Sequence, residues 1–273
     1  MSKSYSLVVF LVTLGPIVSG QSFDNRLFSG MKWRTVGPYR GGRTRACTGI
    51  AAAPEVRVVV LSAAGERAFC AGADLKERAG MTDADILRQR HAIRATFGAL
   101  LALPQPAIAA VHGFALGGGC ELALSCDLVV ADATATFGLP EVTVGLVPGG
   151  GGTQLALRRL GSGRAADLVL TGRRVGIDEA ERLGLVDRRV AAGQDGPAAL
   201  DLAGQIAANS PVAVRAAKRA IRQGAGIGLD PALEVEDAAW RTAALSADRR
   251  EGIAAFNAKR PPAWPGQQGG GGG

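Results

Sequence analysis

Short apolar runs separated by segments of helical pattern constrain the fold of this chain more than any other sequence feature. These runs are residues 56–61 (VRVVVL), 107–111 (AIAAV) and 128–131 (LVVA). Such nearly continuous apolar stretches are typical of strands buried on both faces. Between the first two, residues 83–103 carry apolar side chains close to helical spacing, and Thr82 with Asp85 predicts a capping box at its start. Repeated strand–helix units predict an α/β fold.

A helical region is expected to complete the domain. The predicted helices are residues 119–126, 152–160, 162–171, 178–183, 200–208, 211–223 and 231–259. Of the 273 residues, 47% are hydrophobic and only 20% are charged, which suits one well-buried domain with appendages. We place that domain at residues 54–264.

The two ends of the chain differ in composition from this domain. Residues 1–20 resemble a signal peptide, because Lys3 precedes an apolar run, residues 7–18, that ends in small residues; a buried strand or helix is the alternative. The run is too short to span a bilayer comfortably. Residues 21–53 form an unrelated Gly- and Arg-rich segment, and its WR and GPYRGGR stretches resemble the start of secreted bacterial β-propeller proteins. Residues 265–273 form a flexible Gly-rich tail.

Charge and cysteine usage exclude several function classes. The formal net charge is +7, but the arginines are spread along the chain, and no run of five or six like charges marks a nucleic-acid arm. A modest positive field would still attract an anionic ligand. Four cysteines without a CxxC pair, and only two histidines, predict no metal site. Cys70, Cys120 and Cys126 lie among small apolar residues and are expected to be buried free thiols, as in a reducing compartment.

Glycine-rich segments are the first candidates for a binding site. They are residues 71–77 (AGADLKE), 116–121 (LGGGCE) and 148–153 (PGGGGT). None ends in Gly-Lys-Ser/Thr, which excludes a P-loop, and the second lacks the last glycine of a dinucleotide fingerprint. The strand–glycine–helix order at residues 107–126 would present unpaired N–H groups to developing negative charge. A tight turn packed against a neighbouring strand is the alternative.

Two carboxylates favour catalysis. Glu121 is expected on an otherwise apolar helix, and Glu141 precedes the mostly apolar residues 142–147. An ionisable group in apolar surroundings tends to acquire a raised pKa unless it is paired. Two such groups can move a proton on and off a reacting carbon. A structural salt bridge is the alternative for each of them.

The order of these segments resembles one family. The segments AGADLKE, HGFALGGGCELALSCDLVVA, FGLPEVTVGLVPGGGGTQ, SPVAVRAAKRAI and FNAKRPPAW resemble the enoyl-CoA hydratase (crotonase) family, in its order and with compatible spacing. AGADLKERAGM with PGGGGTQ is most similar to its 3-methylglutaconyl-CoA hydratase branch. The resemblance implies a crotonase-like ββα superhelix with a C-terminal helical region. The family's N-terminal strands are missing or replaced in residues 1–53, so an open sheet edge is expected beside residues 56–61.

The resemblance also implies roles for individual residues. The backbone N–H groups of Ala73 and Gly118 would form the oxyanion hole for the thioester oxygen, and Glu121 and Glu141 would hold the reacting water between them. The implied residues along the substrate and its CoA moiety are Ala71, Ala73, Asp74, Leu75, Lys76 and Gly118. Phe256 and Lys259 would cover the adenine end or a neighbouring subunit.

Hydration of a 2-enoyl-CoA thioester is therefore the expected activity. Glutamate at both positions favours it over the enoyl-CoA isomerase reaction of the same superfamily. It also competes with two different interpretations, a catalytically impaired chimeric or fusion protein and an RNA-binding protein. The resemblance implies no cofactor beyond the CoA of the substrate, no metal, no nucleic-acid partner and no stable membrane span. It implies a homo-oligomer, a trimer or a dimer of trimers, and a cytoplasmic location that conflicts with the signal-peptide-like start.

Overall fold

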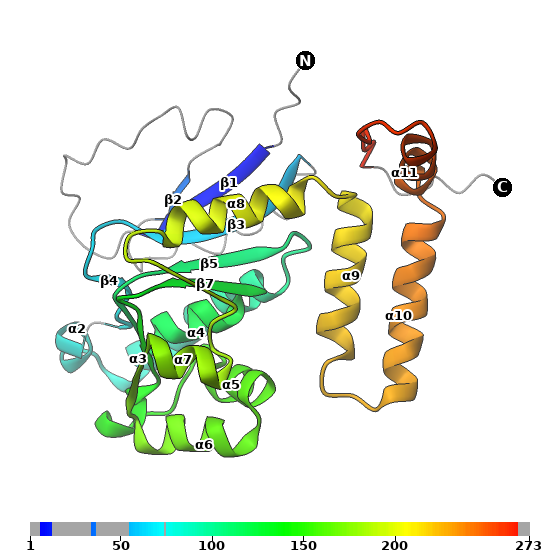
Figure 1. Cartoon of the computed structure of the whole chain (residues 1–273). Coiled ribbons are helices and arrows are strands. Elements are labelled where there is room, and N and C mark those ends of the chain that lie inside the picture. Colours follow the sequence, from blue (N-terminus) through cyan, green and yellow to red (C-terminus); the bar gives the residue numbers. More distant parts are fainter. Residues whose placement is uncertain (1–5, 13–33, 37–54, 74, 267–273) are drawn as a thin grey trace.

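The computed structural model describes residues 6–12, 34–36, 55–73 and 75–266. A six-stranded sheet lies at the centre of the fold, in the order β10-β7-β5-β3-β1-β2 (Figure 1). Its strands are β1 (Ser6–Val12), β2 (Arg34–Val36), β3 (Val56–Ala63), β5 (Ala107–Val111), β7 (Leu128–Asp132) and β10 (Arg188–Val190). Every neighbouring pair in this sheet is parallel.

A second sheet of four short strands lies beside the first. It has the order β4 (Ala68–Cys70), β6 (Phe114–Leu116), β8 (Thr136–Gly138) and β9 (Arg174–Gly176). Along the chain, β3, β5 and β7 are each followed by one of these short strands and then by a helical segment. This strand–strand–helix repeat confirms the expected ββα architecture. The short strands were not predicted, because three residues are too few to show a period.

One or more helices follow each strand–strand unit of this repeat. They are α2 (Leu75–Ala79) and α3 (Asp83–Leu101) after β4, α4 (Gly118–Ser125) after β6, and the 3₁₀ helix η1 (Pro140–Val144), α5 (Gly152–Leu160) and α6 (Ser162–Thr171) after β8. The chain continues with α7 (Ile177–Leu183), α8 (Asp195–Ala207), α9 (Pro211–Gly224), α10 (Leu229–Ala244) and α11 (Ala247–Asn257). The capping box predicted at Thr82 and Asp85 is present at the start of α3.

Two helix boundaries differ from the prediction by more than a residue or two. The segment 231–259 is two helices rather than one, because the Ser246 hydroxyl accepts a hydrogen bond from the Arg249 N–H and so caps a new helix. Helix α8 begins at Asp195 rather than at residue 200, with Pro197 in its first turn, where the missing N–H costs no intrahelical bond.

The strands β3, β5 and β7 of the central sheet are buried on both faces. Val59 and Leu61 of β3 pack in the larger apolar cluster, whereas Val58 and Val60 pack in a second cluster with α8. Side chains of a strand alternate between the two faces of a sheet, so both faces need apolar residues when helices cover both. All five residues of β5 are fully buried, which explains why AIAAV contains no polar residue.

The prediction of an open sheet edge beside β3 is wrong. Strand β1 pairs with β3 in parallel, with Phe10 opposite Leu61 and Val12 opposite Ala63, so backbone groups on that side of β3 have partners. Strand β1 falls inside the segment predicted as a signal peptide. The remainder of residues 1–20, residues 21–53 apart from β2, and residues 267–273 lie outside the described residues.

Helices α9, α10 and α11 stand beside this core rather than on a face of the sheet (Figure 1). Helix α9 is joined to the core by Lys218, which is buried and whose Nζ lies 2.7 Å from Asp127 Oδ2 and 2.7 Å from the Gln105 carbonyl oxygen. In the part of the chain that the structure describes, no helix is long and apolar enough to cross a membrane.

Candidate active site

The turn between β6 and α4 places the first carboxylate. Gly117 has φ +54°, in a region that favours glycine, and turns the chain directly into α4. Gly119, in the first turn of α4, packs so closely on β4 that a Cβ there would lie 1.7 Å from the Cys70 carbonyl oxygen. A Cβ on Gly72 would lie 3.4 Å from the Gly118 nitrogen. Glycines therefore let the loop after β4 and the start of α4 approach each other.

Glu121 is fixed by backbone N–H groups from the third glycine-rich segment. Its side chain is buried, and its Oε1 accepts hydrogen bonds from the N–H of Gly150 at 2.6 Å and of Gly152 at 2.8 Å. A Cβ on Gly150 or on Gly152 would lie 2.9 Å from a carboxylate oxygen of Glu121. The PGGGGT segment thus contains glycine because its backbone closes around a carboxylate.

Burial raises the pKa of Glu121, while the N–H groups of Gly152 and Gly150 and the positive charge of Arg90 oppose this rise in pKa. Arg90, on α3, also donates a hydrogen bond to the Gly149 carbonyl oxygen, so it is attached to the segment that holds Glu121. Hydrogen bonds to the ionised form favour a carboxylate that holds or deprotonates water.

Glu141 lies on η1 and is much less restrained. Its side chain is half-buried, and its Oε2 has no hydrogen-bond partner among the described residues. Burial raises the pKa of Glu141 to about 7, with a further contribution from the charge of Glu121. A Cβ on Gly117 would lie 3.2 Å from Glu141 Oε1, so the turn that begins α4 passes close to this carboxylate.

The structure describes the predicted binding residues only in part, because the loop after β4 has gaps. Gly72 lies against the start of α4, next to Gly118. Ala71 and Leu75 are exposed beside it, as a ligand contact requires. Asp74 lies outside the described residues, and of Lys76 only the backbone in α2 is described. Phe256 is 83% exposed on α11, at a distance from this loop in the fold (Figure 1).

Sequence reasoning missed the residues that hold the carboxylates. The PGGGGT segment was noted as glycine-rich, but its hydrogen bonds to Glu121 join positions about 30 residues apart and leave no local signal. Arg90 and Arg78 were also missed; the charge of Arg78 lowers the pKa of Glu141. Arg78 lies on α2 and Arg90 on α3, and a charged side chain on a helix is usually a solvated one.

The cysteines near the site are poor nucleophiles. Cys70, Cys120 and Cys126 are buried thiols, as predicted. Burial raises the pKa of Cys120 and of Cys126 to about 12, so both stay protonated at neutral pH. Within the described ranges, no group of three His, Cys, Asp or Glu side chains is placed to hold a metal ion.

The ββα fold and a pair of carboxylates with raised pKa values are the arrangement expected of an enzyme of the acid–base class. Residues 44–267 match the model of the enoyl-CoA hydratase/isomerase family. YngF of Bacillus subtilis (strain 168), named as an enoyl-CoA hydratase/isomerase, is 46% identical over 211 residues, which cover 77% of this chain and 81% of YngF. The mitochondrial methylglutaconyl-CoA hydratase of Rattus norvegicus is 42% identical over 78% of this chain and 69% of its own length.

Solved structures agree. An enoyl-CoA hydratase from Bacillus anthracis superimposes with a TM-score of 0.80 at 45% identity, over 82% of this chain and 86% of that one. Pseudomonas aeruginosa DspI also gives a TM-score of 0.80, at 30% identity, over 97% of this chain and 95% of DspI. The chain belongs to the enoyl-CoA hydratase/isomerase family, whose members act on acyl-CoA substrates, and it has the crotonase fold.

Proposed function

We propose that this protein adds water across the C2=C3 double bond of a 2-enoyl-CoA thioester. The observation that carries the proposal is the pair Glu121 and Glu141: the charge of Glu121 acts on Glu141, and the two carboxylates occupy different environments. Two carboxylates whose surroundings differ in this way are equipped for opposite proton transfers. An isomerisation needs a single group that removes and returns a proton, so the second glutamate favours hydration.

The N–H groups of Ala73 and Gly118 would bind the thioester oxygen. Gly118 is the first residue of α4, so its N–H has no acceptor within the helix and is available to a ligand. The approach of Gly72 to the Gly118 nitrogen supports a shared site for the two N–H groups. Negative charge on this oxygen grows as the enolate forms, and removal of one such donor costs roughly 3–4 kcal/mol of transition-state stabilisation.

The environments assign the proton transfers. Glu121, with Oε1 held by two N–H groups, would act as the base that takes a proton from water while the water oxygen bonds to C3. Glu141, with its pKa near 7, would deliver its proton to C2. The net result is addition of one water molecule, and solvent exchange then restores the proton of Glu141 and removes that of Glu121.

Loss of the conjugated enoyl-thioester absorbance of crotonyl-CoA tests the reaction. Glu121→Gln and Glu141→Gln should each lower kcat by about 10²- to 10⁴-fold, because each removes one proton-transfer group. Glu234→Gln, at an exposed position of α10, should leave kcat unchanged. Wild-type kcat should fall as pH rises above about 7, where Glu141 loses its proton. Conversion of a 3-enoyl-CoA without any hydration would instead support an isomerase.

The preferred acyl chain is proposed to carry a carboxylate, as in 3-methylglutaconyl-CoA. Arg78 and Arg90 both act on the catalytic carboxylates electrostatically, and Arg78 is held by a 3.2 Å hydrogen bond from its Nε to Gln89 Oε1. Guanidinium groups bind carboxylates well. Arg78→Gln should therefore lower kcat/KM for 3-methylglutaconyl-CoA at least about tenfold more than for crotonyl-CoA. Equal losses for the two substrates would contradict this preference.

The cytoplasmic location and a homo-oligomeric state are proposals as well. CoA esters and free thiols favour a reducing compartment, although several curated relatives are mitochondrial. Exposed apolar side chains on α10 and α11, among them Trp240 and Phe256, support association of copies of the chain. Sedimentation equilibrium at micromolar concentration measures the state; a monomer would contradict the expected trimer or dimer of trimers.

A further inference from the structure

The short helix that carries Glu141 rests on the turn that follows α6. Gly172 ends α6 with φ +63° and lies against η1: a Cβ at this position would be 2.7 Å from Thr143 Cγ2 and 3.4 Å from Pro140 Cα. The same turn leads into β9, where Arg174 pairs with Gly138 of β8 just before η1 begins. The turn at Gly172–Arg173 therefore contacts η1 directly and also pairs with the strand that enters it.

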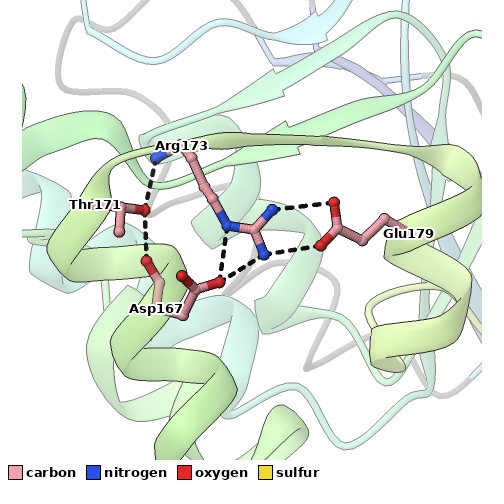
Figure 2. Close-up of polar contacts among 4 residues, drawn as sticks. All are labelled: Asp167, Thr171, Arg173 and Glu179. Carbon is pink, nitrogen blue, oxygen red and sulfur yellow. Dashed lines mark hydrogen bonds and ion pairs between the residues drawn. The ribbon is translucent and has the colours of Figure 1, made fainter.

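One side chain ties this turn to two helices. The Arg173 guanidinium donates from Nε to Asp167 Oδ2 of α6 at 2.8 Å, and from Nη1 and Nη2 to both oxygens of Glu179 of α7 at 3.0 and 2.8 Å (Figure 2). Its backbone N–H donates to Thr171 Oγ1 at 3.2 Å, and this hydroxyl donates to the Asp167 carbonyl oxygen. Bidentate guanidinium–carboxylate pairs fix geometry better than a single ion pair.

We propose that Arg173 is a positioning residue for Glu141, holding the turn on which η1 rests so that the Glu141 carboxyl stays beside Gly117 at the start of α4. The proposal rests on the hydratase function proposed above. Arg173 acts through the turn, because Gly172 contacts the η1 residues Pro140, Val142 and Thr143 while the guanidinium binds α6 and α7.

The effect of Arg173 is mechanical rather than electrostatic. The charged groups that act on Glu141 are Glu121 from α4, which raises its pKa, and Arg78 from α2, which lowers it. Arg173 is not among them. A lysine at this position would keep the charge but lose the fork that spans Asp167 and Glu179. Arg173→Lys should therefore hold the turn less firmly than the wild type, although it keeps the positive charge.

Steady-state hydration of crotonyl-CoA by the full chain measures this role. Arg173→Ala should lower kcat by about 10- to 100-fold with KM changed less than about threefold, the loss expected when a reacting group is displaced by roughly 1 Å. Arg173→Lys should fall between this variant and the wild type. The matched control is Arg189→Ala, which removes an arginine of similar exposure that pairs with Asp178 and Glu181 of α7; kcat should stay within about twofold.

A second readout needs no catalysis. Carboxyl ¹³C NMR titration should show the pKa of Glu141 lower in Arg173→Lys and Arg173→Ala than in the wild type, because a displaced carboxyl gains water and moves away from Glu121. Unchanged kcat per folded protein and an unchanged Glu141 pKa, with only the melting temperature lowered, would overturn the proposal. If Arg173→Ala fails to fold, the kcat and the Glu141 pKa of Arg173→Lys decide between the outcomes. Absence of hydratase activity in the wild-type protein would refute the proposed function. The titration would still test whether Arg173 positions Glu141.

Discussion

Glu121 and Glu141 are the same residue type in one site, and their surroundings make them different acids. The first is buried and receives two N–H groups on one oxygen, whereas the second has a buried oxygen without a partner among the described residues. Desolvation disfavours the charged form of both. Backbone hydrogen bonds oppose this rise in pKa at both, from several glycine N–H groups at Glu121 and from its own backbone at Glu141. The Gly-rich backbone around Glu121 is thus what separates the roles proposed for the two.

The raised pKa of Glu141 predicts a specific pH dependence of stability. Folded protein keeps this proton up to about pH 7, whereas the unfolded chain releases it near 4.5, so the wild-type free energy of unfolding should fall as pH rises between these values. Glu141→Gln removes this loss. From pH 5 to pH 8 the variant should gain roughly 1–2 kcal/mol over wild type, a value reduced for solvent screening of a half-buried group.

Urea unfolding at the two pH values measures this difference. Glu234→Gln on the exposed face of α10 is the control, and its difference from wild type should not change with pH. A Glu141→Gln difference that is equally constant from pH 5 to pH 8 would show that the Glu141 carboxyl titrates as it does in an unfolded chain.

At the scale of one element, α4 is positioned by its contact with β4. Ala at position 119 would bring Cβ within 1.7 Å of the Cys70 carbonyl oxygen, and backbone cannot move aside as a flexible side chain can. Gly119→Ala should therefore destabilise the protein by about 4 kcal/mol or more. Gly98→Ala, in α3 with nothing within 4 Å, should instead stabilise by about 0.5–1 kcal/mol. Thermal unfolding followed by circular dichroism measures both; equal effects would contradict the close helix–strand contact.

The attachment of α9 depends on a buried ion pair. Asp127 receives Lys218 Nζ at 2.7 Å, Arg222 Nε at 2.8 Å and the Ala107 N–H at 2.7 Å, so it joins α9 to the loops that begin β5 and β7. Lys218→Met should cost about 3–5 kcal/mol of unfolding free energy, because Asp127 loses its most buried partner. Asp237→Asn, which breaks the exposed pair with Arg241 on α10, should cost less than about 0.5 kcal/mol. Comparable losses in urea unfolding would contradict this ranking.

Elements of strong local pattern could be predicted from the sequence, and those defined by distant contacts could not. The residues 107–111 appear as a strand because burial on both faces requires every side chain to be apolar. The three-residue strands of the second sheet carry no period, and the break at Ser246 lies inside a segment that is otherwise suited to a helix. The two glutamates were predicted; the glycine N–H groups that hold Glu121 are joined to it only by the fold.

For the whole molecule, the N-terminal segment has two competing interpretations, a strand of the central sheet and a signal peptide. Strand β1 covers one side of β3 and also carries β2 on its far side, so the sheet continues beyond the strands that the family resemblance predicted. Its residues belong to the apolar run predicted as a signal peptide. The two interpretations conflict physically, because cleavage after residue 20 would remove β1 and leave the N–H and C=O groups on that side of β3 without partners.

A protein that starts at residue 21 should therefore unfold at a lower urea concentration than the full chain and should aggregate at micromolar concentration, since an uncovered, apolar strand edge pairs with other chains. Deletion of residues 267–273, which leaves the hydrogen bond from the Gly266 N–H to Asp248 Oδ1 intact, is the control and should change neither property. The Val59 N–H donates to the Pro106 carbonyl oxygen on the β5 side, so the alternate residues Val60 and Ser62 present their N–H groups to β1. Amide hydrogen exchange of Val60 and Ser62 should be slow in the full chain and in the control, and faster in the shortened protein. Equal stability and equal exchange in all three proteins would mean that β1 contributes nothing to the sheet in solution and would favour the signal-peptide interpretation of residues 1–20.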